Sequence, residues 1–294
     1  MTTNHSPLTT AMKPWRFIST GYNDAFFNMA LDEALLVSCQ ESNSPPILRL
    51  YQWNPAGISL GYSQTTAKTV DLEKCRDLHI DVVRRITGGR AVLHDSELTY
   101  SVCASASEFP ELGRNTLQTY RIISQALLES LLILGIEGEW VKPARELESS
   151  SAPTIVAKPC FISTSRYEIT VNGRKLIGSA QRRFCAHLDL SAKESFIQHG
   201  SILTGKGRYN LADFLPPESS AEKVKRDLEG SSTNLEEILK RETEFRELIS
   251  SLKTGFSKIF DAEMTDSSVS ADEFNRACAL KESKYKTSQW NFRM

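Results

Sequence analysis

Two side chains of this sequence, Cys160 and Lys175, are of types that together could form a thiolate nucleophile. Cys160 lies in a polar stretch, which favours an exposed loop. Lys175 comes shortly after Asn172-Gly173, a pair that is typical of a tight hairpin turn. If the loop and the hairpin meet, the Lys175 ammonium would lower the pKa of the Cys160 thiol. Such a pair could carry an acyl group as a thioester. Simpler interpretations are a buried, inert cysteine and a solvated strand lysine.

A second chemically suggestive stretch runs from Arg84 to Asp95 and contains Gly88, Gly89 and His94. Paired glycines let a backbone approach a ligand, and their N–H groups can hold an oxyanion or a carbonyl. An ordinary tight turn would explain the glycines alone, but the flanking charges favour a binding loop. The spacing excludes a phosphate loop of the Walker type.

Three further polar residues have open interpretations. His199 could lie at the entrance of a site, or it could be a satisfied structural histidine. Arg182 and Arg183 could face an acidic carrier protein, or they could form a solvated face.

The Asn-Gly turn is the strongest local signal for the element that positions Lys175. A two-residue turn would pair Val171 with Arg174 and Thr170 with Lys175. Lys175 would then share a face of the hairpin with Thr170 and Glu168.

The remaining patterns predict an α+β fold with a mixed β-sheet core flanked by helices. Helices are expected over 28–37, 70–78, 117–134 and from 218 onward, with one apolar stripe over 235–252. Strands are expected over 47–51, 57–61, 81–85, 98–104, 167–171, 174–177 and 196–203. We expect a disordered tail over 1–14, a catalytic domain over 15–260 and a C-terminal extension over 261–294 that packs on this domain.

Composition excludes several classes of function. The formal net charge is -1, so no global field recruits nucleic acid or an anionic membrane. The six cysteines include no Cys-x-x-Cys pair, so we expect no zinc or iron–sulfur site. We also expect no other metal and no cofactor. No apolar run is long enough to span a bilayer, and the N-terminal stretch lacks the apolar core of a signal peptide. We expect a cytoplasmic protein with reduced thiols.

Taken together, these stretches resemble the biotin/lipoate protein ligase superfamily and, within it, the LipM-type octanoyltransferases. The resemblance extends over most of the chain. It is carried by the runs at 21–23, 28–36, 48–53, 59–64, 84–94, 97–101, 173–181 and 198–201.

ATP-dependent lipoate ligases share this scaffold, but they differ from the sequence at four places. They tend to have a third glycine where Arg90 stands, and tyrosine where Gln181 stands. They also tend to have His-His-Gly-Thr where this chain has Gln198-His199-Gly200-Ser201, and they lack Cys160. The differences favour a transferase. We also expect no accessory domain after residue 292.

The resemblance implies octanoyl transfer from octanoyl-acyl carrier protein to a lysine of a lipoyl domain such as the glycine cleavage H protein. It implies no ATP, a cytoplasmic monomer, and catalysis by Cys160 and Lys175. The substrate-binding residues that it implies are Arg84, Gly88, Gly89, Arg90, His94, Gly178, Ser179, Ala180 and His199. Two alternatives stay open: an ATP-dependent lipoate ligase, and a non-catalytic protein that binds lipoyl domains or acyl carrier protein.

Overall fold

The computed structural model describes residues 12–41, 44–141, 168–184, 193–216 and 221–292. These residues form an eight-stranded mixed sheet in the order β11-β1-β2-β6-β10-β9-β8-β7 and a three-stranded sheet in the order β4-β3-β5. The strands of the large sheet are β1 (Lys13–Asn23), β2 (Ile47–Trp53), β6 (Glu97–Ser105), β7 (Glu139–Trp140), β8 (Ile169–Val171), β9 (Arg174–Phe184), β10 (Ser195–Leu203) and β11 (Ala262–Asp266). Those of the small sheet are β3 (Gly57–Leu60), β4 (Asp81–Arg84) and β5 (Val92–His94). The predicted α+β class is confirmed.

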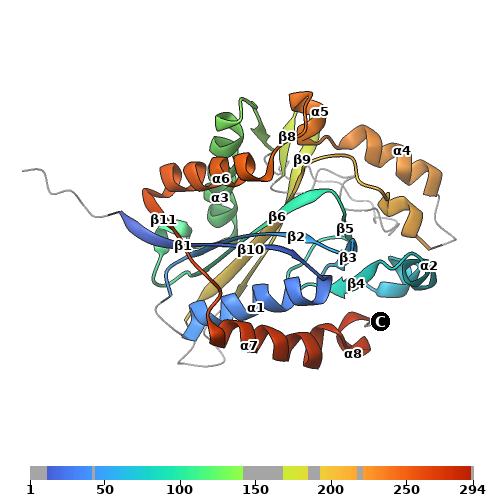
Figure 1. The fold of residues 1–294 in the computed structure, drawn as a ribbon, viewed down its shortest axis with the longest axis horizontal. Coiled ribbons are helices and arrows are strands. Elements are labelled where there is room, and N and C mark those ends of the chain that lie inside the picture. Colours follow the sequence, from blue (N-terminus) through green and yellow to red (C-terminus); the bar gives the residue numbers. More distant parts are fainter. Residues whose placement is uncertain (1–11, 42–43, 142–167, 185–192, 217–220, 293–294) are drawn as a thin grey trace, which may run out of the picture.

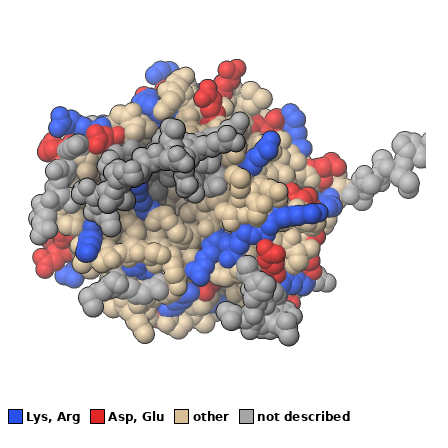
Figure 2. Space-filling view, turned by 180° about the vertical axis from the view of Figure 1, so that it is seen from behind, with Lys and Arg blue, Asp and Glu red and all other residues tan. Residues whose placement is uncertain are grey.

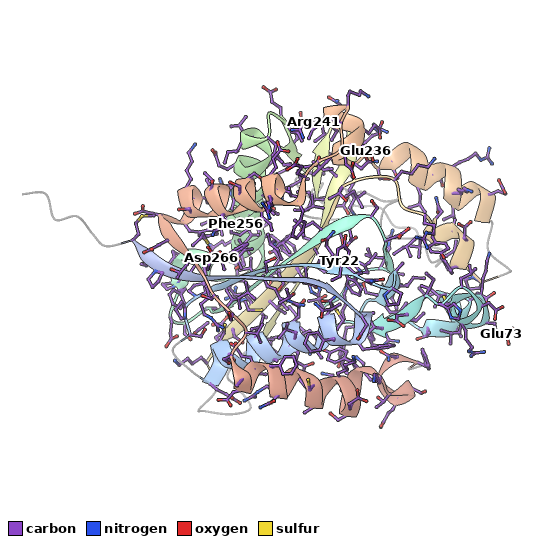
Figure 3. The ribbon with its side chains drawn as sticks, viewed as in Figure 1. Tyr22, Glu73, Glu236, Arg241, Phe256 and Asp266 are labelled. Carbon is purple, nitrogen blue, oxygen red and sulfur yellow. The ribbon has the colours of Figure 1, made fainter. Side chains whose placement is uncertain are left out.

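Helices cover both faces of the large sheet (Figure 1). The described helices are α1 (Ala25–Glu41), α2 (Leu72–Asp77), α3 (Thr116–Ile133), α4 (Ala221–Ser231), α5 (Leu235–Leu239), α6 (Phe245–Phe260), α7 (Ala271–Leu280) and α8 (Ser288–Asn291). One face packs against α3 and α6, with Phe256 of α6 buried against the sheet (Figure 3). The other face packs against α1, which α7 covers from outside. Central strand β6 is therefore buried along its whole length, as expected for a strand covered on both faces.

The hairpin that carries Lys175 forms as predicted. Val171 pairs with Arg174, and Thr170 pairs with Lys175. Asn172 and Gly173 both have positive φ, of 51° and 74°, as a type I′ turn requires. The return strand β9 continues to Phe184, well beyond the predicted end at residue 177, and pairs with β10 along most of this length.

The C-terminal third departs from the expected single helical stripe. The chain there forms α4, α5 and α6, and Lys240 ends α5 with a left-handed φ of 57°. The apolar positions of 235–252 therefore belong to two separate helices, α5 and α6. After α6 the chain adds β11 to the sheet, parallel to β1, which the sequence did not predict. No described helix is both long and apolar enough to cross a membrane.

The predicted boundaries can be compared with the described elements at two places. β1 begins at Lys13, two residues before the expected start of the catalytic domain. The segment after residue 261 contributes β11 to the large sheet and α7 to the layer on α1. The division at 260/261 stays a prediction.

Candidate active site

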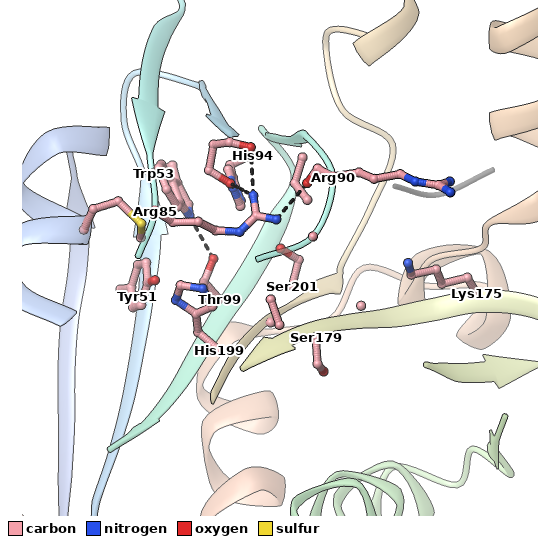
Figure 4. Close-up of a pocket in the computed structure, with 17 residues that line it drawn as sticks. Tyr51, Trp53, Arg85, Arg90, His94, Thr99, Lys175, Ser179, His199 and Ser201 are labelled. Carbon is pink, nitrogen blue, oxygen red and sulfur yellow. Dashed lines mark hydrogen bonds between the residues drawn. The ribbon is translucent and has the colours of Figure 1, made fainter. Parts of the chain in front are cut away.

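A cavity of about 190 Å³ is lined by α1, by β2, β6, β9 and β10 of the large sheet, and by β3 and β5 of the small sheet (Figure 4). Most of the predicted site residues lie on its wall, although they are far apart in the sequence. These residues are Gly89, Arg90, His94, Lys175, Gly178, Ser179, Ala180 and His199. The geometry therefore brings the glycine loop, the hairpin and β10 to one place.

Two predicted residues, Arg84 and Gly88, are not among the described lining residues, and a third cannot be compared. Cys160 lies outside the described residues, so its distance from Lys175 stays open. The buried guanidinium of Arg84 donates to the carbonyl oxygens of Gly61 and Asn291, at 2.8 and 2.9 Å, which ties a loop to the C-terminal helix. Gly88 is not among the described lining residues, but its carbonyl oxygen accepts from the neighbouring Arg85.

Lys175 is buried and forms an ion pair with Glu168. Its Nζ lies 2.5 Å from Glu168 Oε1, and both side chains are almost fully buried. The predicted shared face of these two residues is thus confirmed. In Figure 4, Lys175 lies at the opposite end of the cavity from Tyr51 and Trp53. A buried lysine held in one position by a carboxylate can act on a reacting group at this end.

Arg85 holds the glycine loop against the cavity. Its guanidinium donates to the carbonyl oxygens of Gly88 and Arg90, both at 2.8 Å, and to Ser59 Oγ at 3.0 Å. Gly89 has a φ of +97°, and a Cβ there would lie 2.7 Å from Arg85 Nη2. Glycine is therefore required at this position for both conformation and space.

The carboxylate of Asp32 lies at the centre of a buried network beside the cavity. It accepts hydrogen bonds from Arg49 at 2.7 Å, Ser101 at 2.8 Å, Tyr51 at 2.9 Å and His199 at 3.0 Å. Burial alone would raise the pKa of Asp32, but the Arg49 charge and the hydrogen bond from His199 outweigh it and lower this pKa. Asp32 is therefore an ionised anchor for cavity-lining residues.

His199 connects this anchor to the glycine loop. Burial lowers its pKa despite the neighbouring Asp32 carboxylate, so the imidazole is neutral. The ionised Asp32 accepts from Nδ1–H at 3.0 Å, which leaves Nε2 to accept from the Thr87 hydroxyl at 2.6 Å. Thr87 directly precedes Gly88, so His199 helps to position the loop as well as lining the cavity.

His94 is fixed in a similar way at another part of the wall. Its Nδ1 lies 2.6 Å from Glu97 Oε1, and its Nε2 lies 2.7 Å from Ser59 Oγ. The Trp53 ring stacks on the imidazole with the centroids 3.8 Å apart and the planes 8° apart. These contacts hold the His94 ring in one orientation.

Sequence reasoning missed Arg85, Asp32, Ser59 and Trp53. The predicted strand 81–85 contained both arginines, but only one of two successive residues of a strand can face a given side. The sequence alone did not indicate which one, and the structure places Arg85 rather than Arg84 on the cavity wall. Asp32 lies on a helix and acts through long-range contacts, for which no local signal exists.

The expected docking arginines have partners within the molecule. Arg182 lies over the Tyr62 ring at 4.4 Å and donates to the Ile86 carbonyl at 3.1 Å. Arg183 forms an ion pair with Glu194 at 2.9 Å. Figure 2 shows a band of Lys and Arg side chains across the face of the molecule that it draws. Docking of an acidic carrier at Arg182 and Arg183 stays a prediction.

Comparison with known proteins decides the family. Residues 24–257 match the lipoyl protein ligase A/B catalytic domain. The chain is 36% identical over 281 residues to the octanoyltransferase LipM of Bacillus subtilis (strain 168), covering 95% of this chain and 98% of that protein. It is 37% identical over 285 residues to the octanoyltransferase LipM of Geobacillus kaustophilus (strain HTA426), covering 96% and 99%. The chain belongs to the lipoyl protein ligase A/B family.

Within this family the chain groups with the LipM octanoyltransferases, which confirms the predicted membership and the class of acyltransferases. Solved structures agree on the fold. A bipartite lipoate protein ligase from Thermoplasma acidophilum superposes with a TM-score of 0.75 at 22% identity, covering 95% of this chain and 96% of that chain. A lipoate-protein ligase A bound with ATP superposes with a TM-score of 0.73 at 23% identity, covering 96% and 98%. The predicted ligase-like fold is therefore confirmed.

Proposed function

We propose that this enzyme transfers an octanoyl group from an acyl carrier protein to a lysine of a lipoyl domain, through a thioester on Cys160. The observation that carries the proposal is the position of Lys175. This buried, ion-paired lysine lies at one end of a cavity in a chain that groups with octanoyltransferases. The reaction needs no ATP, because the donor thioester already holds an activated acyl group.

In the first step the Cys160 thiolate attacks the carbonyl carbon of the donor thioester. A bond forms between the Cys160 sulfur and this carbon, and the carbon–sulfur bond to phosphopantetheine breaks. The released thiolate takes a proton from the Lys175 ammonium, which leaves Lys175 as a neutral amine for the second step. The Lys175 ammonium stabilises the Cys160 thiolate before attack. Backbone N–H groups of the Gly88-Gly89 loop or at Cys160-Phe161 donate to the developing oxyanion.

In the second step the acceptor lysine attacks the acyl-enzyme as a neutral amine. The new carbon–nitrogen bond forms as the bond to the Cys160 sulfur breaks, and Lys175 accepts the proton that the amine loses. The amide is much more stable than the thioester, so this step drives the transfer. Acceptors of this class include the glycine cleavage H protein. The enzyme acts as a cytoplasmic monomer on these two protein partners.

Intact mass after incubation with octanoyl-acyl carrier protein, without ATP, tests the proposal. We expect an octanoyl adduct that hydroxylamine removes from the wild type and from Cys278→Ala, a half-buried cysteine of α7. Cys160→Ala should form no adduct and should not modify a lipoyl domain.

Two outcomes would contradict the proposal. Modification of a lipoyl domain that requires ATP and free lipoate, and survives Cys160→Ala, would identify a ligase. Binding of a lipoyl domain without any adduct or modification would identify a non-catalytic binder.

A further inference from the structure

The cavity has two chemically different ends. Lys175 lies at one end, and the aromatic rings of Tyr51 and Trp53 lie at the other (Figure 4). Met29 of α1 also lines the cavity and belongs to the same buried cluster as these two rings. Under the proposed function, the acyl carbonyl reacts near Lys175. The methyl end of the chain then points toward the aromatic end.

The two aromatic rings form a rigid part of this end. Trp53 donates from Nε1 to Thr99 Oγ1 at 2.8 Å, and its ring stacks on His94. The Tyr51 hydroxyl donates to the ionised Asp32 at 2.9 Å, and the Arg49 guanidinium lies 3.8 Å from the ring centroid. If either ring moved aside, it would lose a buried hydrogen bond and a contact with its ring face, which would cost free energy.

The two hydroxyl groups that line the cavity near these rings are compatible with a bound alkyl chain. Ser59 and Thr99 line the cavity, but Ser59 Oγ bonds His94 and Arg85, and Thr99 Oγ1 donates to Glu97 at 2.6 Å. These hydroxyls are therefore satisfied within the protein. An apolar chain can lie against them without leaving a polar group unpaired.

Met29 differs from the two rings because its thioether has no polar anchor. Met29 is buried, its side chain is unbranched, and it lines the cavity from α1. We infer that Met29, packed beside the fixed rings of Tyr51 and Trp53, sets the longest acyl chain that the enzyme accepts. The inference rests on the proposed function for the direction of the chain.

Chain-length profiles of Met29 variants test the inference. With hexanoyl, octanoyl, decanoyl and dodecanoyl thioesters of acyl carrier protein, Met29→Ala should raise the decanoyl-to-octanoyl ratio of kcat/KM about tenfold or more. Met29→Phe should shift preference toward hexanoyl to a similar extent. Leu31→Ala is the matched control, since Leu31 is buried on the same helix but is not among the described lining residues. Its ratio should match the wild type.

A binding measurement separates this inference from the proposed transfer. Calorimetric titration with free hexanoate, octanoate, decanoate and dodecanoate measures the Kd of each chain length. Met29→Ala should favour decanoate and Met29→Phe should favour hexanoate, as in the kinetic profiles. If the Kd values shift in this way but no acyl adduct forms, Met29 limits the chain length that binds, and the proposed octanoyl transfer is contradicted. Unchanged chain-length ratios in both variants, or no alkanoate binding by any protein, would overturn the inference.

Discussion

The buried pair of Lys175 and Glu168 has a structural contribution that differs from any role in chemistry. Both side chains lie almost completely out of water, 2.5 Å apart. Removing one partner of such a pair leaves an uncompensated buried charge, whereas replacing both by apolar residues can be nearly neutral. The two contributions can therefore be separated by comparing single and double variants.

Lys175→Met should lower the free energy of unfolding by about 3–5 kcal/mol, because it leaves the Glu168 carboxylate buried without its ammonium. Lys175→Met combined with Glu168→Leu should recover most of this stability in urea denaturation. The double variant should still form no octanoyl adduct, since the amine is missing. A double variant with wild-type adduct formation would show that Lys175 is not needed to activate Cys160.

At the scale of elements, helix α7 of the C-terminal region is attached to strand β1 of the large sheet. Arg16 of β1 makes a two-point ion pair with Glu273 of α7, at 2.6 and 2.9 Å. The same carboxylate accepts from the Ser270 backbone N–H at 2.8 Å, where α7 begins. One side chain thus caps α7 and fixes it to the large sheet.

The pKa of Glu273 makes this docking dependent on pH. Burial alone would raise the pKa, but the hydrogen bonds from Arg16 and Ser270 lower it from 4.5 to about 2. A lowered folded-state pKa contributes stability above the unfolded value of 4.5, and this contribution is lost as pH falls through about 2.

We expect Glu273→Gln to lower the free energy of unfolding by about 1.5–3 kcal/mol at neutral pH. The difference from the wild type should narrow as the pH falls toward about 3. Urea denaturation of both proteins between neutral pH and about pH 3 measures this difference. Glu282→Gln, on the exposed surface, should show no such trend. If the difference in free energy of unfolding stays constant with pH, the ionised Glu273 carboxylate does not contribute to stability.

Features that depend on neighbouring residues could be predicted from the sequence, whereas features that depend on residues far apart in the chain could not. The hairpin was predictable to the residue because Asn172 and Gly173 determine the turn locally. Strand β11 was not, because its sequence reads as an ordinary surface segment and pairs with β1 across most of the chain. In the same way, the site residues near glycines or next to the turn were found. Asp32 was missed because it acts only through contacts with distant strands.

At the scale of the whole molecule, the C-terminal helix α8 is linked to the active-site loop. The Asn291 side chain accepts from the Arg84 backbone N–H at 2.8 Å, and the Asn291 carbonyl accepts from the Arg84 guanidinium at 2.9 Å. Arg84 in turn holds the Gly61 carbonyl. Gly61 packs so closely on Gly89 that a Cβ would lie 1.9 Å from the Gly89 oxygen. A continuous chain of contacts therefore runs from α8 to the cavity.

Asn291→Ala should lower the free energy of unfolding by about 1–3 kcal/mol, because the buried N–H of Arg84 loses its acceptor. It should also speed hydrogen exchange in the loops at 61–66 and 86–90, which are far from the mutation in sequence, since Arg84 would hold them less firmly. Gln289→Ala, an exposed position on the same helix, is the matched control and should change neither quantity. If exchange accelerates only around residue 291, α8 stabilises its own surroundings and the link to the glycine loop is absent.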